Sequence, residues 1–131
     1  MADDVEKQDG VWVGPETSDT VTRAKVINSP DEHEDYEGQT LVTTNHEVIR
    51  RWAEERGGVP STVPGTEHGD HLGVLRFQFP GFGSEDLEEV SWEEFFDTIE
   101  QRKLNFIFQE HMSDGTQSNF FRFESPHRET A

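Results

Sequence analysis

The stretch that decides the fold is residues 90–108, VSWEEFFDTIEQRKLNFIF, where every local signal indicates a helix followed directly by a strand. Ser91 and Glu94 have the spacing of a capping box, in which each side chain binds the backbone N–H group of the other residue. Acidic residues follow this cap and basic residues close the last turn, as the helix dipole favours. The sequence therefore predicts a helix that begins at Ser91 and ends near Lys103.

The apolar residues of this stretch change from a helical to a strand period. They first recur at i, i+3, i+4 and i+7, and then alternate from Leu104 to Phe108, with Asn105 and Ile107 on the opposite face. An aromatic stripe of this kind lines a ligand pocket in some proteins, but large aromatic side chains are more often buried. With the neighbouring elements added, we expect a core of Trp52, Leu75, Phe77, Phe79, Trp92, Phe95, Phe96, Ile99, Leu104, Phe106 and Phe108.

Composition divides the chain into three parts. Residues 1–43 are acidic, with dispersed glycine and proline and few apolar residues, so we expect an arm that is largely disordered. Residues 44–124 show regular apolar periods and should form one domain. Residues 125–131 should fray, as chain ends without apolar anchors do.

Six elements are expected in the domain, in the order helix, strand, strand, helix, strand, strand. Their ranges are 44–56, 59–63, 73–79, 91–103, 104–109 and 117–123. Glycine should end the first helix, prolines place the first strand at a sheet edge, and an Asp-Gly pair marks the last hairpin turn. An antiparallel sheet needs at least one covered face. We therefore predict an α+β fold of two layers, with two helices packed on one face of a mostly antiparallel four-stranded sheet.

The strongest global feature is charge. The chain has 28 Asp and Glu residues against 11 Lys and Arg residues, a net charge of −17. An acidic surface with few lysines suits molar salt, where carboxylates hold hydrated cations and the screening length falls to about 3 Å. We interpret the chain as a protein of an extreme halophile with hydrated potassium or sodium ions at its surface. The alternative is an ordinary acidic protein with a disordered tail.

Few patterns in the sequence carry chemistry. There is no cysteine, which excludes disulfides and thiolate sites. His68, Asp70 and His71 place two imidazoles and a carboxylate within four residues, which makes them the best candidates for a metal site. No obvious further ligand accompanies this loop, so we expect no tight metal site, no cofactor and no catalytic residue.

A basic surface for nucleic acid is not expected either. Arg50, Arg51 and Arg56 share one helix, but acidic neighbours such as Glu54 and Glu55 neutralise them at i, i+4 spacing. No apolar run approaches the ~18–20 residues of a membrane span, and the acidic N-terminus differs from a signal peptide. We therefore expect a cytoplasmic protein without membrane or nucleic-acid contacts.

Three segments together resemble a known family. They are NHEVIRRWAEERGG at 45–58, LRFQFPG at 75–81 and LEEVSWEEFFDTIEQRKLNFIFQE at 87–110, followed by SNFFRF at 118–123. They are similar to small bacterial and haloarchaeal proteins of unknown function, some of which are labelled 1,4-alpha-glucan branching enzymes. That activity needs two carboxylates on a barrel of about 250 residues, which a chain of 131 residues cannot form.

These observations favour a small, non-catalytic interaction or regulatory module that binds an unidentified protein partner. Two other classes stay open. A nucleic-acid-associated protein would need a clustered basic surface, and a small metal-dependent protein would need a third ligand beside His68 and His71.

Overall fold

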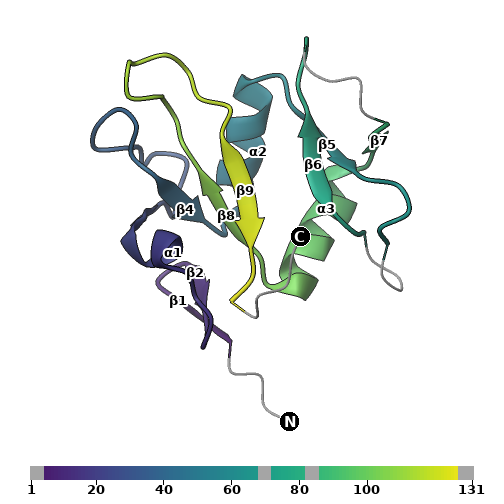
Figure 1. Cartoon of the computed structure of the whole chain (residues 1–131), viewed down its shortest axis with the longest axis horizontal. Helices are drawn as coiled ribbons and strands as arrows, with labels where there is room; N and C mark the ends of the chain where they lie inside the picture. Colours follow the sequence, from purple (N-terminus) through teal and green to yellow (C-terminus); the bar gives the residue numbers. More distant parts are fainter. Residues whose placement is uncertain (1–4, 68–71, 82–85, 127–131) are drawn as a thin grey trace.

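Helices and strands are interspersed along the chain, which confirms the α+β class (Figure 1). The computed structural model describes residues 5–67, 72–81 and 86–126. In chain order, the elements are β1 (Glu6–Gln8), β2 (Val11–Val13), α1 (Asp19–Arg23), β3 (Lys25–Val26), β4 (Leu41–Thr43), α2 (His46–Glu55), β5 (Val59–Thr62), β6 (Leu75–Gln78), β7 (Glu88–Glu89), α3 (Trp92–Arg102), β8 (Asn105–Phe108) and β9 (Phe121–Glu124).

The strands of the described residues form three sheets, and the predicted single sheet is not found. A four-stranded sheet has the order β3-β4-β8-β9, a three-stranded sheet the order β6-β5-β7, and β1 pairs with β2. The two predicted hairpins therefore lie in different sheets. The reason is that β4 takes the edge of β8 that a single sheet would need, with Leu41 opposite Phe108 and Thr43 opposite Phe106.

Both main helices begin and end where local signals predict. Ser91 caps α3 and forms the complete capping box with Glu94. Lys103 ends this helix in the left-handed conformation, with a φ of 52°. Asn45 caps α2, and Gly57 follows that helix with a φ of +70°, which costs glycine little. Local side-chain chemistry thus sets the ends of these two helices.

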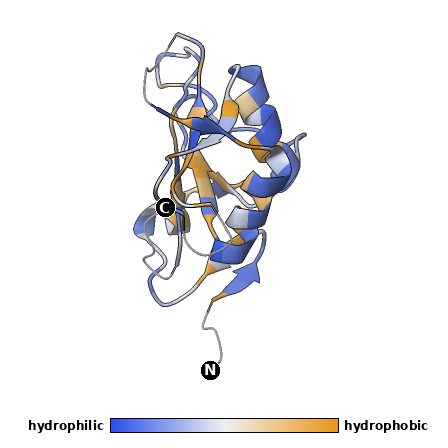
Figure 2. Cartoon of the chain, turned by 90° about the vertical axis from the view of Figure 1, so that its right-hand side faces the viewer, coloured by the Kyte–Doolittle hydropathy of each residue, from blue (hydrophilic) through white to orange (hydrophobic). Residues whose placement is uncertain are grey.

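The main core lies between the four-stranded sheet, α2, α3 and the three-stranded sheet. Figure 2 shows hydrophobic residues concentrated inside and hydrophilic ones on the outer faces of the helices. Of the residues expected in the core, the structure buries Trp52, Leu75, Phe77, Phe95, Ile99, Leu104, Phe106 and Phe108. The other three, Phe79, Trp92 and Phe96, are partly buried and pack against that core.

The opposite face of the four-stranded sheet is covered by the arm, so the sheet is covered on both faces and the two predicted layers are not found. Val11 and Val21 pack there against Val42 and Ile107 in a second cluster. Figure 1 shows α1, β1 and β2 on one side of this sheet and α3 on the other. The expectation that residues 1–43 are largely disordered therefore differs from the structure of residues 5–43. Few apolar residues suffice here because Val11 and Val21 both pack on one face of the sheet, formed by Val42 and Ile107.

Hydrogen bonds to the backbone of the arm complete its attachment. The Asn105 side chain accepts from the Trp12 N–H group and donates to the Trp12 carbonyl, each at 2.9 Å. The Ile27 N–H donates to the Val42 carbonyl at 2.9 Å, next to the parallel pair β3-β4.

At the other end of the chain, Ser125 is buried although a frayed tail was expected from that position, and residues 127–131 lie outside the described part. No helix in the described part is long and apolar enough to cross a membrane.

Candidate functional site

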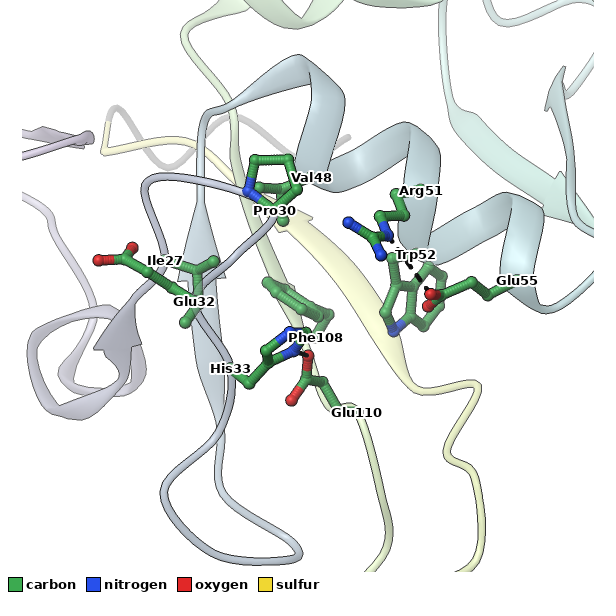
Figure 3. Close-up of a pocket in the computed structure, with 10 residues that line it drawn as sticks. All are labelled: Ile27, Pro30, Glu32, His33, Val48, Arg51, Trp52, Glu55, Phe108 and Glu110. Atoms are coloured by element: carbon green, nitrogen blue, oxygen red, sulfur yellow. Dashed lines mark hydrogen bonds and ion pairs between the residues drawn. The ribbon is translucent and has the colours of Figure 1, made fainter.

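A shallow pocket with a volume of about 30 Å³ lies where the arm meets α2 and the end of β8 (Figure 3). Ligand pockets commonly measure about 300–1,000 Å³, so this one is a small surface depression rather than a pocket for a cofactor. One wall comes from the arm segment 27–33, another from α2, and the third from Phe108 and Glu110.

The floor of the pocket is apolar. Ile27, Val48, Trp52 and Phe108 line it, and all four belong to the main core cluster. Val48 and Trp52 lie one helical turn apart on the buried face of α2, while Phe108 lies on the face of β8 that points toward that helix. The pocket is therefore a place where the apolar core comes close to solvent.

The rim of the pocket is charged. Arg51 and Glu55 form an i, i+4 ion pair with 3.5 Å between Nε and Oε2, and both side chains are about half exposed. Across the mouth, His33 Nδ1 lies 2.8 Å from Glu110 Oε2. Glu32 is exposed on the same rim, and its carboxylate accepts the backbone N–H of Asn28. Three carboxylates therefore face one guanidinium and one imidazole.

Two crossed histidine–glutamate pairs join the arm to the loop after β8. His33 pairs with Glu110, and His111 pairs with Glu34 at 2.5 Å between Nδ1 and Oε2. The Glu34 N–H also donates to Glu110 Oε1 at 2.8 Å. The remaining oxygen of Glu34, Oε1, is buried and has no hydrogen-bond partner among the described residues. These contacts hold the arm wall of the pocket in register with the β8 wall.

Arg56 joins the end of α2 to the segment between β8 and β9, next to the pocket. Its guanidinium donates from Nε to the Ser118 carbonyl at 2.6 Å, from Nη1 to the Trp52 carbonyl at 3.0 Å, and from Nη2 to the Glu110 carbonyl at 2.9 Å. It also lies 4.5 Å from the centre of the Trp52 ring. Burial lowers the pKa of Arg56 from its ordinary value, because a buried charge loses its hydration.

Sequence reasoning missed this role of Arg56 and treated it as one of three basic helix residues. The available signal was an arginine directly before the glycine that ends a helix, a position from which basic side chains bind the last carbonyls. The pairs Arg50–Glu54 and Arg51–Glu55 are present, as predicted from their spacing. With Arg56 buried, the three arginines of this helix do not form an uncompensated basic patch.

The other sequence candidates do not meet in this site. His68, Asp70 and His71 lie outside the described residues. Within the residues that are described, no group of three or more His, Asp or Glu side chains is placed to hold a metal ion. Lys25 donates to Asp35 at 2.9 Å and lowers the pKa of that carboxyl, which keeps it ionised beside the arm wall.

Comparison of the chain with models of protein families, with curated proteins and with solved structures finds no match. The resemblance to small bacterial and haloarchaeal proteins therefore stays a prediction. The site is interpreted from its own chemistry, which is an apolar floor under a rim of carboxylates.

Proposed function

We propose that this chain is a non-catalytic interaction module that binds a protein partner at the pocket between the arm and α2. The observation that carries the proposal is the shallow pocket at which the buried core residues Ile27, Val48 and Phe108 come close to the surface inside a charged rim. Protein interfaces combine an apolar centre with a polar edge.

The proposal also concerns the environment of the protein. On the ground of its net charge of −17, we place the module in the cytoplasm of an extreme halophile, with hydrated cations at its surface. We further propose kinship with the small bacterial and haloarchaeal proteins named above. Two of the three resembling segments, 45–58 and 87–110, supply the α2 and β8 walls of the pocket.

Capture in about 2 M potassium chloride, followed by measurement with the purified partner, tests this function. Glu32→Lys reverses a charge on the rim, whereas Glu93→Lys makes the same change at an exposed position on α3. Titration calorimetry should show at least tenfold weaker binding for Glu32→Lys and an unchanged affinity for Glu93→Lys. Failure to find a partner that distinguishes these two variants would contradict the proposal.

A further inference from the structure

We infer that the two crossed histidine–glutamate pairs form a pH-sensitive latch, which holds residues 33–38 of the arm on the segment after β8 while the imidazoles are charged and releases them at higher pH. The pairs are His33–Glu110 and His111–Glu34, and each joins a histidine of one segment to a glutamate of the other. This device goes beyond the proposed function, because it needs no partner protein.

The latch consists of short contacts made in both directions. Figure 3 shows His33 of the arm beside Glu110, with 2.8 Å between Nδ1 and Oε2. His111 Nδ1 lies 2.5 Å from Glu34 Oε2. Two backbone donors accompany these pairs, the Glu34 N–H to Glu110 Oε1 at 2.8 Å and the Gly38 N–H to the His111 carbonyl at 3.1 Å. The arm is therefore held at both ends of residues 33–38.

Glu34 is the residue that makes the latch depend on charge. Its side chain is only 11% exposed, and Oε1 is buried without a hydrogen-bond partner among the described residues. A buried carboxylate that loses its charged partner is strongly destabilised, because neither water nor a cation then compensates its charge. The Glu34 carboxylate thus needs the His111 imidazolium to stay in this position.

The permanent cations near the latch bind carbonyls or other carboxylates. Lys25 binds Asp35 and a backbone carbonyl of the arm, and Arg51 pairs with Glu55. Arg56 lies closer, but its N–H groups bind three carbonyls. Within the described part of the chain, only the imidazoles form ion pairs with the two glutamates of the latch.

The charge of these imidazoles changes near neutral pH. Histidine titrates between about pH 5 and pH 8, where carboxylates, lysine and arginine ordinarily keep their charge. A charged imidazole donates from both nitrogens in bonds about twice as strong as neutral ones, whereas a neutral imidazole donates from only one nitrogen. Glu32, on the rim beside His33, adds a further negative charge. The latch therefore stabilises the attached arm while the histidines are charged, and this stabilisation is lost as the pH rises through their range.

Amide hydrogen exchange of the full chain in about 2 M potassium chloride tests the latch, with each rate divided by the intrinsic rate at the same pH. The Glu34 and Gly38 N–H groups report on the latch, and the Ile27 N–H, which binds the Val42 carbonyl, reports on the rest of the arm. Between about pH 5.5 and pH 8.5, the protection of the two latch amides should fall at least tenfold, and that of Ile27 less than twofold.

Charge-neutral variants assign this effect to the two pairs. His33→Gln combined with His111→Gln should leave the latch amides weakly protected at both pH values. His46→Gln is the matched control, because it removes a similar pair, 2.8 Å from Glu100, that joins α2 to α3. This control should behave like the wild type. In the wild type, the fall in protection should follow the titration of the His33 and His111 rings, measured by nuclear magnetic resonance.

A second variant tests the role of the buried carboxylate. Glu34→Gln should keep the Gly38 N–H protected at about pH 8.5, because an uncharged side chain needs no imidazolium. Unchanged protection of the latch amides in the wild type would overturn the inference, and so would an equal fall at Ile27, which would indicate loss of the whole arm. A tenfold fall that persists in the double variant or in Glu34→Gln would also overturn it, because another group would then be responsible.

Discussion

Replacing Arg56 by lysine should destabilise the protein strongly although it conserves the charge. The guanidinium donates to three carbonyls that lie around its planar fork, those of Trp52, Glu110 and Ser118. An ammonium group is a single point with a shorter reach, so it can satisfy about one of these positions. Two of these carbonyls would then lose a charge-assisted donor.

The size of the loss follows from these contacts. A hydrogen bond to a charged group contributes about 1.5–3 kcal/mol, so two lost bonds amount to about 3–6 kcal/mol before any relaxation. Lysine also loses part of the contact with the Trp52 ring. Water that enters the space left by the guanidinium would recover some of this loss. We therefore expect the free energy of unfolding to fall by about 2–4 kcal/mol, a large share of the ~5–15 kcal/mol of a typical domain.

Urea denaturation in 2 M potassium chloride measures this change. Arg51→Lys is the matched control, because Arg51 lies on the same helix, is about half exposed and has one i, i+4 partner at 3.5 Å. Such exposed pairs contribute about 0.3–0.5 kcal/mol, so the control should stay close to the wild type. Equal stability of the two variants would show that the three carbonyl contacts of Arg56 contribute nothing specific.

Four further predictions concern the core, the attachment of the arm, the dependence of the melting temperature on salt, and the dependence of stability on acidic pH. Phe95→Ala should lower the free energy of unfolding by about 3–5 kcal/mol, since Phe95 is fully buried; a loss under 1 kcal/mol would contradict its place in the core. Asn105→Leu should cost about 2–4 kcal/mol and speed amide exchange in β2, because it leaves the Trp12 N–H and carbonyl without their partners. The melting temperature should rise between 0.05 M and 2 M potassium chloride as the repulsion within a chain of net charge −17 is screened; a flat dependence would refute the halophile interpretation. Lys25 holds the pKa of Asp35 below its ordinary 3.8, so the pair stabilises the fold above that pH and its contribution disappears as the pH falls through the folded-state pKa. Denaturation of Asp35→Asn and wild type across this range should therefore show a stability difference at pH 6 that vanishes in acid.

The parts of the fold that the sequence predicts are those set by neighbouring residues. The capping box of Ser91 and Glu94 and the stop at Gly57 are local, and both helices form where these signals place them. The pairing of Leu41 with Phe108 joins residues far apart in the chain, and no local sequence signal near either residue predicts it. A three-residue strand also has too few positions to show a period, so the sequence assigns the residues of β4 to the arm.

The site divides in the same way. The stripe of Val48 and Trp52 and the spacing of Arg51 and Glu55 are visible in the sequence of α2. The pairing of His33 with Glu110 spans 77 positions and depends on where the arm lies. His33 lies in an acidic run of the arm, and such runs are typically solvated, so the sequence does not indicate this pairing.

The arm and the pocket therefore depend on each other. Ile27 and Glu32 belong to the arm, and they reach α2 only because the Ile27 N–H binds the Val42 carbonyl and the Thr43 hydroxyl binds the Ile27 carbonyl at 2.6 Å. On the far face of the same sheet, Asn105 holds β2 against β8. An asparagine in an aromatic strand looks like a solvent-facing residue in the sequence, yet here it is 1% exposed and its side chain joins β2 to β8. Loosening the arm at Asn105 should consequently weaken binding at a pocket on the opposite side of the sheet, without changing any residue that lines it.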